Sequence, residues 1–299
     1  MATFQSWIKA ARLRTLPLAL SSIAMGGFLA AAYENFNLLP VLLAGLTTLF
    51  LQILSNMAND YGDSKSGIDN QHRLGPARTV QSGEITLTEM KAAVLLFALL
   101  SFVCGLALIF LASGLNLINS LLFLFAGISA IGAAINYTVG KNPYGYAGFG
   151  DLFVFLFFGL AGVCGTYFLA TKNLNFYVLL PASAMGLLST GVLNLNNMRD
   201  MANDRANQKN TIVVKIGFRK AYIYHCLIVL LPFVLLFIYS VINFKGLPQL
   251  AFLLLLPLFI LDLVKIRTTS PMERLDPFLK KLAFKTLLLT VVFGFGNLI

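Results

Sequence analysis

Two short stretches of the chain place asparagine and aspartate residues at spacings that suit metal binding. The spacing is i, i+4, i+7 in the first stretch and i, i+4, i+8 in the second, so in each the oxygens share one face of a helix. The residues are Asn56, Asp60 and Asp63 in the first acidic cluster and Asn196, Asp200 and Asp204 in the second acidic cluster. Carboxylates stacked in this way repel one another, and a divalent cation relieves that repulsion. Mg²⁺ prefers hard oxygen ligands and binds through a few carboxylates together with substrate phosphates. We therefore expect the two clusters to hold Mg²⁺ and a diphosphate between them.

A simpler interpretation is that these residues only end helices at a membrane surface. Asn56 and Asn196 lie 140 residues apart and begin the same NxxxD pattern. This repetition favours a site over two unrelated helix caps, because acids close to a bilayer are costly and mostly functional.

Basic residues flank both clusters and could bind phosphate oxygens, for which arginine offers a fork of donors and lysine a point charge. They are Arg73, Arg78, Lys141, Arg205 and Lys209. The alternative is the ordinary excess of positive charge in cytoplasmic loops, which we prefer for Lys91, Lys220 and Lys265.

The composition places this chemistry in a membrane. The chain has 299 residues, of which 11% are charged and 58% hydrophobic, and its mean hydropathy is +0.81. A soluble domain carries about 25% charged residues, so a soluble enzyme, a disordered protein and a nucleic-acid binder are excluded. The three cysteines lie in apolar runs without metal-ligand spacing, and we interpret them as small buried hydrophobic residues.

The order of apolar runs predicts an all-α polytopic membrane protein with nine transmembrane helices. The runs cover about 16–33, 37–57, 91–113, 115–136, 149–171, 176–199, 219–241, 246–264 and 280–298. The first run resembles a signal peptide, but it is long for one and a second run follows at once, so we expect an uncleaved helix. Each acidic cluster closes the second helix of a four-helix block. This predicts one domain, 1–299, with repeat halves of about 1–140 and 141–264 and an extra helix at about 280–298.

The basic residues also predict the orientation. With the N-terminus inside, 19 of the 22 Lys and Arg residues fall on the cytoplasmic face, and such an excess marks the inner side. The N-terminus and the site are then cytoplasmic, and the C-terminus is outside.

Several motifs together resemble the UbiA superfamily of intramembrane prenyltransferases, over nearly the whole chain. They are ARLRTLP (11–17), NDYGD (59–63) with Gly67 and Asp69, RLGPAR (73–78), KNPYGY (141–146), GFGD (148–151) and NNMRD (196–200). Within the superfamily they are most similar to the 1,4-dihydroxy-2-naphthoate polyprenyltransferases of menaquinone (vitamin K2) biosynthesis. Two positions depart from the pattern: Ser64 stands where the last Asp of the general spacing would fall, and Asp151 where Glu is more usual.

The resemblance implies a reaction and assigns roles to residues. Mg²⁺ held by Asp60, Asp63, Asp200 and Asp204 would draw charge from a polyprenyl diphosphate, with Asn56 and Asn196 completing the coordination or binding phosphate. The basic residues, Arg14 of the first motif among them, would bind the diphosphate. The naphthoate ring would then attack the allylic cation and lose carbon dioxide, giving demethylmenaquinol. Lys141, Tyr144 and Asp151 are the residues that we expect near this chemistry and the acceptor.

The resemblance also implies the bacterial cytoplasmic membrane as location, with the lipid bilayer and the two substrates as partners and no obligate protein partner. Two alternatives remain open. Another acceptor, such as 4-hydroxybenzoate or haem, would suit the same superfamily. A transporter could also carry acids at helix ends in a structural repeat, although the helix centres here are nearly pure hydrocarbon.

Overall fold

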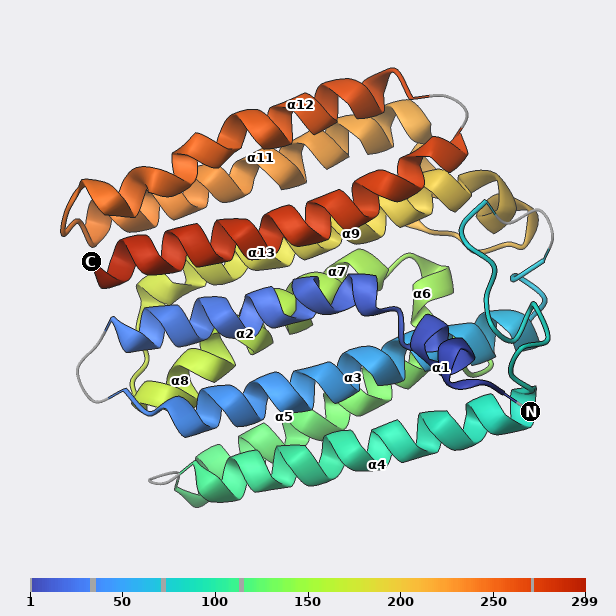
Figure 1. Ribbon diagram of the computed structural model, residues 1–299, viewed down its shortest axis with the longest axis horizontal. Helices are drawn as coiled ribbons and strands as arrows, with labels where there is room; N and C mark the ends of the chain where they lie inside the picture. The colour runs from blue at the N-terminus through green and yellow to red at the C-terminus, as the bar shows by residue number, and fades with distance from the viewer. Residues whose placement is uncertain (1, 33–35, 71–73, 113–115, 270–271) are drawn as a thin grey trace.

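The computed structural model describes residues 2–32, 36–70, 74–112, 116–269 and 272–299, and these residues form helices and no strand. Eight segments are long and apolar enough to cross a membrane. A further long helix, α13 (Asp276–Leu298), lies beside α9 (Leu179–Ala206) but is not among those eight (Figure 1). The all-α, polytopic architecture is therefore confirmed for the described residues, while the count of nine spans stays a prediction.

The long helices of the first half are α2, α3, α4 and α5, at Leu16–Ala31, Leu38–Lys65, Leu87–Leu111 and Leu117–Asn136. Short helices α1 (Phe4–Ala11) and η1 (Leu13–Thr15) precede α2. Local sequence sets several of these boundaries. Asn37 caps α3 by accepting from the Leu39 amide at 3.1 Å, and Thr86 and Glu89 form a reciprocal capping box at the start of α4.

The second half begins with α6 (Tyr144–Ala147) and a long segment made of α7, η2 and α8, at Gly150–Val154, Phe155–Cys164 and Gly165–Thr171. η3 (Phe176–Val178) leads into α9, and α10 (Ile212–Ile216) into α11 (Phe218–Ile242). η4 (Leu247–Leu255), α12 (Leu256–Arg267), η5 (Met272–Leu275) and α13 complete the chain. The short η elements are 3-10 turns except η2, which is π-helical.

The π-helical segment differs from the uninterrupted helix expected over 149–171. Here η2 passes very close to α9. A Cβ on Gly159 would lie 2.7 Å from the Ala182 carbonyl oxygen and 2.8 Å from the Cα of Gly186. Glycine at both positions lets the two backbones touch, as small residues do in membrane helix pairs. Wide π turns are uncommon and frequently found at functional sites, and this one lies against the cavity described below.

Two of the three prolines expected inside helices lie where the type of helix changes. Pro181 and Pro257 lie in the first turns of α9 and α12, directly after the 3-10 segments η3 and η4. Only Pro232 lies in a helix interior, within α11.

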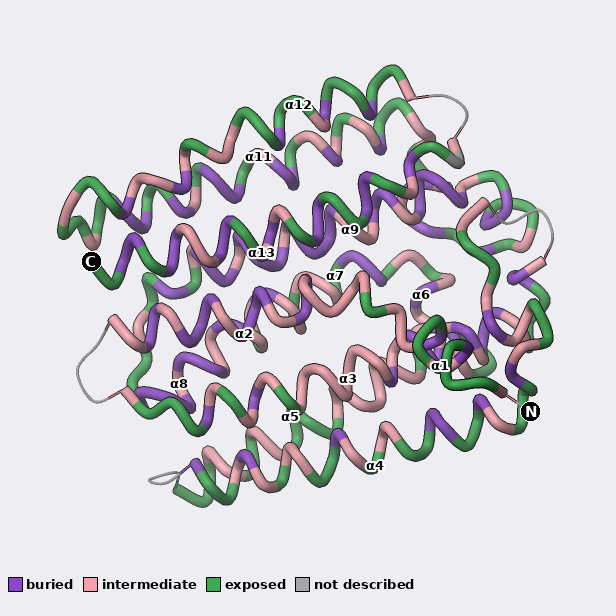
Figure 2. The backbone as a smooth tube through the Cα atoms, viewed as in Figure 1, coloured by how far each residue is buried: buried purple, intermediate pink, exposed green. Residues whose placement is uncertain are grey.

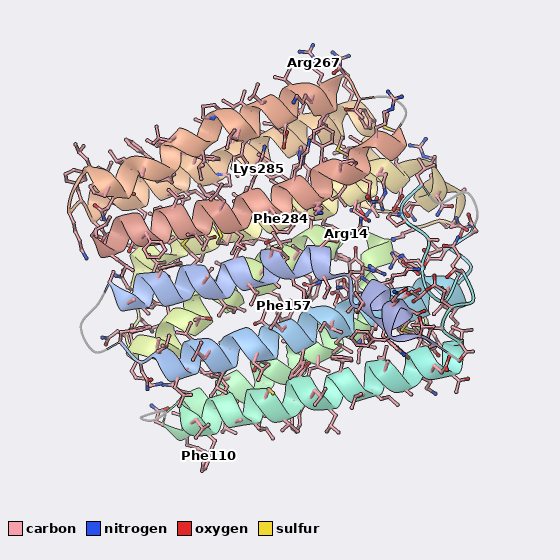
Figure 3. The ribbon with its side chains drawn as sticks, in the orientation of Figure 1. Arg14, Phe110, Phe157, Arg267, Phe284 and Lys285 are labelled. Carbon is pink, nitrogen blue, oxygen red and sulfur yellow. The ribbon has the colours of Figure 1, made fainter. Side chains whose placement is uncertain are left out.

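α9 is one of the most buried helices of the bundle, with α2, η2, α11 and α13 packed around it (Figure 2). α4, α5 and α12 lie toward the outside and expose large apolar side chains, such as Phe110, which projects away from the bundle (Figure 3). Such a continuous apolar surface fits a lipid environment. The N-terminus lies at one end of the bundle with the ends of α3 and α9, hereafter the polar end, and the C-terminus lies at the opposite end (Figure 1).

Candidate active site

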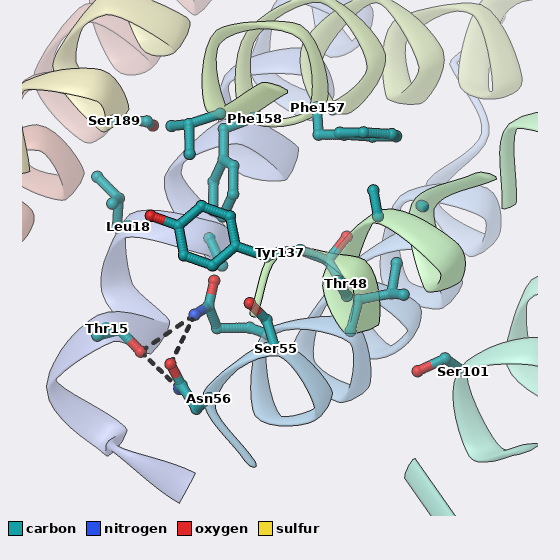
Figure 4. Close-up of a pocket in the computed structure, with 18 of the residues that line it drawn as sticks. Thr15, Leu18, Thr48, Ser55, Asn56, Ser101, Tyr137, Phe157, Phe158 and Ser189 are labelled. Atoms are coloured by element: carbon teal, nitrogen blue, oxygen red, sulfur yellow. Dashed lines mark hydrogen bonds between the residues drawn. The ribbon is translucent and has the colours of Figure 1, made fainter. Parts of the chain in front are cut away.

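A cavity of about 960 Å³ runs from the polar end into the bundle. At the polar end its lining includes charged and amide side chains from both acidic clusters and from the segments that flank them: Arg12, Arg14, Asn56, Asp60, Asp63, Arg78, Asn196 and Lys209. Deeper, the lining is mainly apolar and includes Leu18, Ile23, Leu51, Phe102, Ile109 and Phe157. Phe157 and Phe158 project into this part from η2 (Figure 4). One cavity thus joins a charged mouth to a hydrocarbon interior.

Asn56 joins the first acidic cluster to the N-terminal segment. Its amide nitrogen donates to the Ala11 carbonyl at 2.8 Å and to the Thr15 hydroxyl at 3.0 Å, and its oxygen accepts from Gln52 at 3.3 Å (Figure 4). This network fixes the turn between α1 and α2 against α3. Arg12 in that turn has φ +50°, a left-handed conformation that is unusual for a non-glycine residue.

Asp60 is buried and accepts its hydrogen bonds from the loop that follows α3. Its Oδ2 accepts from the Thr79 amide at 3.1 Å and the Thr79 hydroxyl at 2.7 Å, and its Oδ1 accepts from the Val80 amide at 3.4 Å. These donors are neutral, so they orient the carboxylate without balancing its charge.

Asp63 lies one turn further on and meets a basic and an aromatic side chain. Nη2 of Arg78 lies 3.6 Å from Oδ2 of Asp63, and Nε of Arg78 lies 3.6 Å from Oδ2 of Asp69. The Tyr146 hydroxyl donates to Oδ1 of Asp63 at 2.8 Å. Burial, and after it the negative charge of Asp63, raise the pKa of Tyr146, so this hydroxyl keeps the proton that it donates.

The second acidic cluster is bound to cations of the chain itself. Asp200 forms a two-point ion pair with Arg199, with distances of 3.0 and 2.6 Å, and Arg199 also donates to Asn196 at 2.9 Å. Oδ1 of Asp204 lies 3.6 Å from the Lys209 Nζ, and its Oδ2 is buried without a hydrogen bond.

Lys209 lies between the two clusters. Its side chain is buried and lines the cavity, and its Nζ lies 5.6 Å from the centroid of the Tyr146 ring. Burial alone would lower its pKa, but the carboxylates of Asp63 and Asp204 outweigh that effect and raise it. Lys209 therefore stays charged, as a tethered cation among carboxylates of both clusters.

Two more of the residues expected in the site, Arg14 and Tyr144, lie on the cavity wall. Arg14 lines the cavity and pairs with Asp276 at 2.9 Å. Tyr144 also lines it; its hydroxyl donates to the Ala133 carbonyl at 2.9 Å, and its ring packs on Phe153 with 4.2 Å between the centroids.

Three further predicted residues do not line the cavity, and a fourth lies outside the residues that the structure describes. Asp151 is buried and accepts from the Tyr224 hydroxyl at 3.0 Å, and it is not among the lining residues. Lys141 and Arg205 are exposed and do not line the cavity. Arg73 lies outside the described residues.

Three contacts at the site come from residues to which the sequence assigned no role. They are Thr79, Tyr146 and Arg199. The sequence carried a signal for two of them: Tyr146 ends the KNPYGY motif, and Arg199 directly precedes Asp200. Thr79 offered no comparable signal, since only the folding of the loop brings it to Asp60.

The donor chemistry fits a hard cation, although the carboxylates that the structure describes are not preassembled as a set of metal ligands. Among the described residues, no group of three or more His, Cys, Asp and Glu side chains is assembled closely enough to hold a metal ion. The carboxylates are instead engaged by Arg78, Arg199, Lys209 and neutral donors. The buried, unbonded Oδ2 of Asp204, with Lys209 as a cation already next to it, indicates a place where positive charge is favoured.

Comparison with known proteins finds one family. The model of the UbiA prenyltransferase family matches residues 19–297. The chain is 41% identical to a protein of Haemophilus influenzae over 98% of its own length and 96% of the relative, and 40% identical to one of Escherichia coli over 98% and 94%. Both relatives are named 1,4-dihydroxy-2-naphthoate octaprenyltransferase.

Solved structures share the fold at low sequence identity. A UbiA homolog from Aeropyrum pernix aligns with a TM-score of 0.65 at 17% identity, covering 94% of this chain and 96% of the homolog. A UbiA homolog from Archaeoglobus fulgidus, bound to DMAPP and Mg²⁺, aligns with a TM-score of 0.63 at 15% identity, covering 96% and 98%. By the family match and these close relatives, the chain belongs to the UbiA prenyltransferase family.

Proposed function

We propose that this protein transfers a polyprenyl group from polyprenyl diphosphate to 1,4-dihydroxy-2-naphthoate, with loss of carbon dioxide, to give demethylmenaquinol in menaquinone biosynthesis. Relatives that carry this activity in their names match nearly the whole chain at 40–41% identity. The observation that carries the proposal is that one cavity combines a charged mouth with an apolar interior. A polyprenyl diphosphate has the same two-part chemistry.

Different parts of the cavity bind different parts of the substrates. Arg78 and Lys209 at the mouth bind the diphosphate oxygens and stabilise the charge that develops on the leaving group. The apolar lining takes up the hydrocarbon tail and keeps water from the allylic carbon. Arg14, on the cavity wall, is placed to bind the diphosphate as well, and Tyr144, also on the wall, is placed to contact the aromatic acceptor.

The residues that would hold Mg²⁺ are Asp60, Asp63, Asp200 and Asp204, with Asn56 and Asn196. A structural neighbour with DMAPP and Mg²⁺ bound supports the choice of metal, as do the oxygen donors. When bound, the metal supplies Lewis-acid stabilisation of the departing diphosphate. Roles for Arg73, Lys141, Asp151 and Arg205 remain predictions.

We also propose the arrangement in the membrane. α13 is the ninth span, the two four-helix halves are repeats within one domain of 1–299, and the polar end faces the cytoplasm of a bacterial cell. The cytoplasmic excess of Lys and Arg supports this orientation, and it makes the C-terminus external. No obligate protein partner is required by the proposed reaction.

The test is a transfer assay. Purified protein is incubated with Mg²⁺, a labelled polyprenyl diphosphate and, in separate reactions, 1,4-dihydroxy-2-naphthoate, 4-hydroxybenzoate or haem. We expect a prenylated, decarboxylated product with the naphthoate only, abolished by EDTA and restored by Mg²⁺. Product with another acceptor would replace the naphthoate assignment. Full turnover in metal-free buffer would overturn the role of Mg²⁺, and no transfer to any acceptor would favour a transporter.

A further inference from the structure

The side chain of Arg199 is fully buried at the polar end of α9, with 0% of its surface exposed. A buried guanidinium is costly unless its donors and its charge are both satisfied. Its contacts are therefore informative, because the fold has been built to provide them.

Arg199 divides its donors among three side chains. Nε and Nη2 donate to the two carboxylate oxygens of Asp200, at 3.0 and 2.6 Å. Nη2 also donates to the Asn196 amide oxygen at 2.9 Å, and Nη1 donates to Asp276. One guanidinium thus holds both Asn196 and Asp200, the Asn and the Asp of the NxxxD pattern in the second acidic cluster.

The contacts continue from Asp276 to the cavity wall. The other oxygen of Asp276 accepts from Nη1 of Arg14 at 2.9 Å, and Arg14 lines the cavity. The four charged groups Arg14, Asp276, Arg199 and Asp200 balance one another. They also connect three elements that are far apart in the sequence, namely η1, α9 and the start of α13.

We propose that Arg199 is a positioning residue for the second acidic cluster. It fixes the orientation of Asn196 and Asp200, balances the charge of Asp200 until metal and diphosphate arrive, and joins this cluster through Asp276 to Arg14. The inference rests on the proposed function, in which Asn196 and Asp200 are metal ligands. Arginine is needed because its planar fork meets both oxygens of a carboxylate at once, which a lysine ammonium does not do.

The test compares Arg199→Lys with Arg219→Lys. Both variants keep the charge, but Arg219 is exposed in the first turn of α11 and is not among the residues that line the cavity. Two quantities are measured for each: the rise in melting temperature on adding Mg²⁺ with inorganic diphosphate, and the Mg²⁺ concentration for half-maximal turnover. Loss of a group that orients metal ligands weakens metal affinity about 10- to 100-fold. We expect that weakening in Arg199→Lys, with an unchanged KM for the aromatic acceptor, and the wild-type response in Arg219→Lys.

A wild-type Mg²⁺ response in Arg199→Lys would overturn the proposal, as would a lower melting temperature with unchanged Mg²⁺ dependence, which is the signature of a purely structural role. Should the Arg199 variant fail to fold, Asp276→Asn decides. Asp276 is partly exposed, and the change weakens the link to Arg14 while leaving the Arg199–Asp200 pair intact. A smaller weakening of the Mg²⁺ response supports the inference, and an unchanged one contradicts it. The thermal shift needs no acceptor, so a wrong acceptor assignment would leave this result intact.

Discussion

The Tyr146 hydroxyl donates to the Asp63 carboxylate at 2.8 Å, across 83 residues of sequence. Tyr146 lies in α6, at the start of the second half of the chain, whereas Asp63 lies in the last turns of α3. The same tyrosine ring lies under the ammonium of Lys209, which follows α9. One side chain therefore brings together the first acidic cluster, the start of the second half and the cation next to the second cluster.

Replacing Tyr146 with Phe removes this hydrogen bond and keeps the ring. A hydrogen bond to a charged group contributes about 1.5–3 kcal/mol, so we expect turnover to fall about 10- to 100-fold if Asp63 must be oriented for catalysis. Because burial raises the pKa of Tyr146 above its ordinary value, the wild-type hydroxyl stays protonated, and the difference should not vary with pH through the neutral range. The measurement is turnover against pH for both proteins.

Tyr144→Phe is the matched control. Its hydroxyl donates to the Ala133 carbonyl rather than to an acid, and its ring, which lines the cavity, is retained. Equal losses in the two variants would mean that the hydrogen bond to Asp63 has no special role.

The apolar part of the cavity predicts a dependence on prenyl chain length. Ala161 lines it from η2, and Ala161→Phe would fill space between Phe157 and the neighbouring helices. We expect turnover with a long polyprenyl diphosphate to fall, while dimethylallyl diphosphate is still used, because only the longer tail needs the filled space. Leu227→Phe, at a lipid-exposed position of α11, should leave both rates unchanged. If Ala161→Phe affects both donors equally, the tail does not occupy this part of the cavity.

The sequence predicted the helices well, because long apolar runs are local signals. Polar helix ends are local signals too, and they are the basis of the predicted site. The expected runs agree with the observed segments to within a few residues, and α3 and α9 extend as helices through their acidic clusters. The shared-face argument held less well for the second cluster. Asn196 lines the cavity, whereas Asp200 and Asp204 do not. Eight residues along a helix turn the direction by about 80°, and Arg199 and Lys209 then engage the two carboxylates.

The partners of these acids could not be predicted, because they come from distant segments. Thr79 reaches Asp60 only after the loop folds back, and Asp276 meets Arg199 across 77 residues. The π-helical turns of η2 could not be predicted either, because they accompany the close approach of Gly159 to Gly186, which the local sequence does not reveal.

The proposed orientation predicts opposite labelling of the two ends. In a variant without Cys104, Cys164 and Cys226, a cysteine replaces either Lys220, exposed at the start of α11, or Leu174, exposed between α8 and η3. An impermeant thiol reagent added to intact cells should label the Leu174 variant only. Labelling of the Lys220 variant requires opened cells, and the reverse pattern would invert the proposed orientation.

The last prediction separates metal ligands from helix-ending residues by changing one acid in each cluster. Asp60→Asn removes a charge but preserves size, and the new amide oxygen can still accept from Thr79, so that only the long 3.4 Å bond from the Val80 amide is lost. We therefore expect this variant to keep its melting temperature and to lose at least about 10²-fold in turnover, the usual cost of removing one electrostatic stabiliser. Asp200→Asn removes the partner of a buried arginine, and breaking such a pair typically costs about 3–5 kcal/mol.

The two variants should thus differ in stability and agree in function. Asp200→Asn should melt at a lower temperature than the wild type, with the loss moderated because Arg199 keeps Asp276. Turnover and melting temperature measured on the same preparations decide between the interpretations. Unchanged turnover in Asp60→Asn would reduce its carboxylate to a local anchor for the loop after α3. Unchanged stability in Asp200→Asn would mean that Arg199 does not depend on this pair, which would also weaken its assignment as a positioning residue.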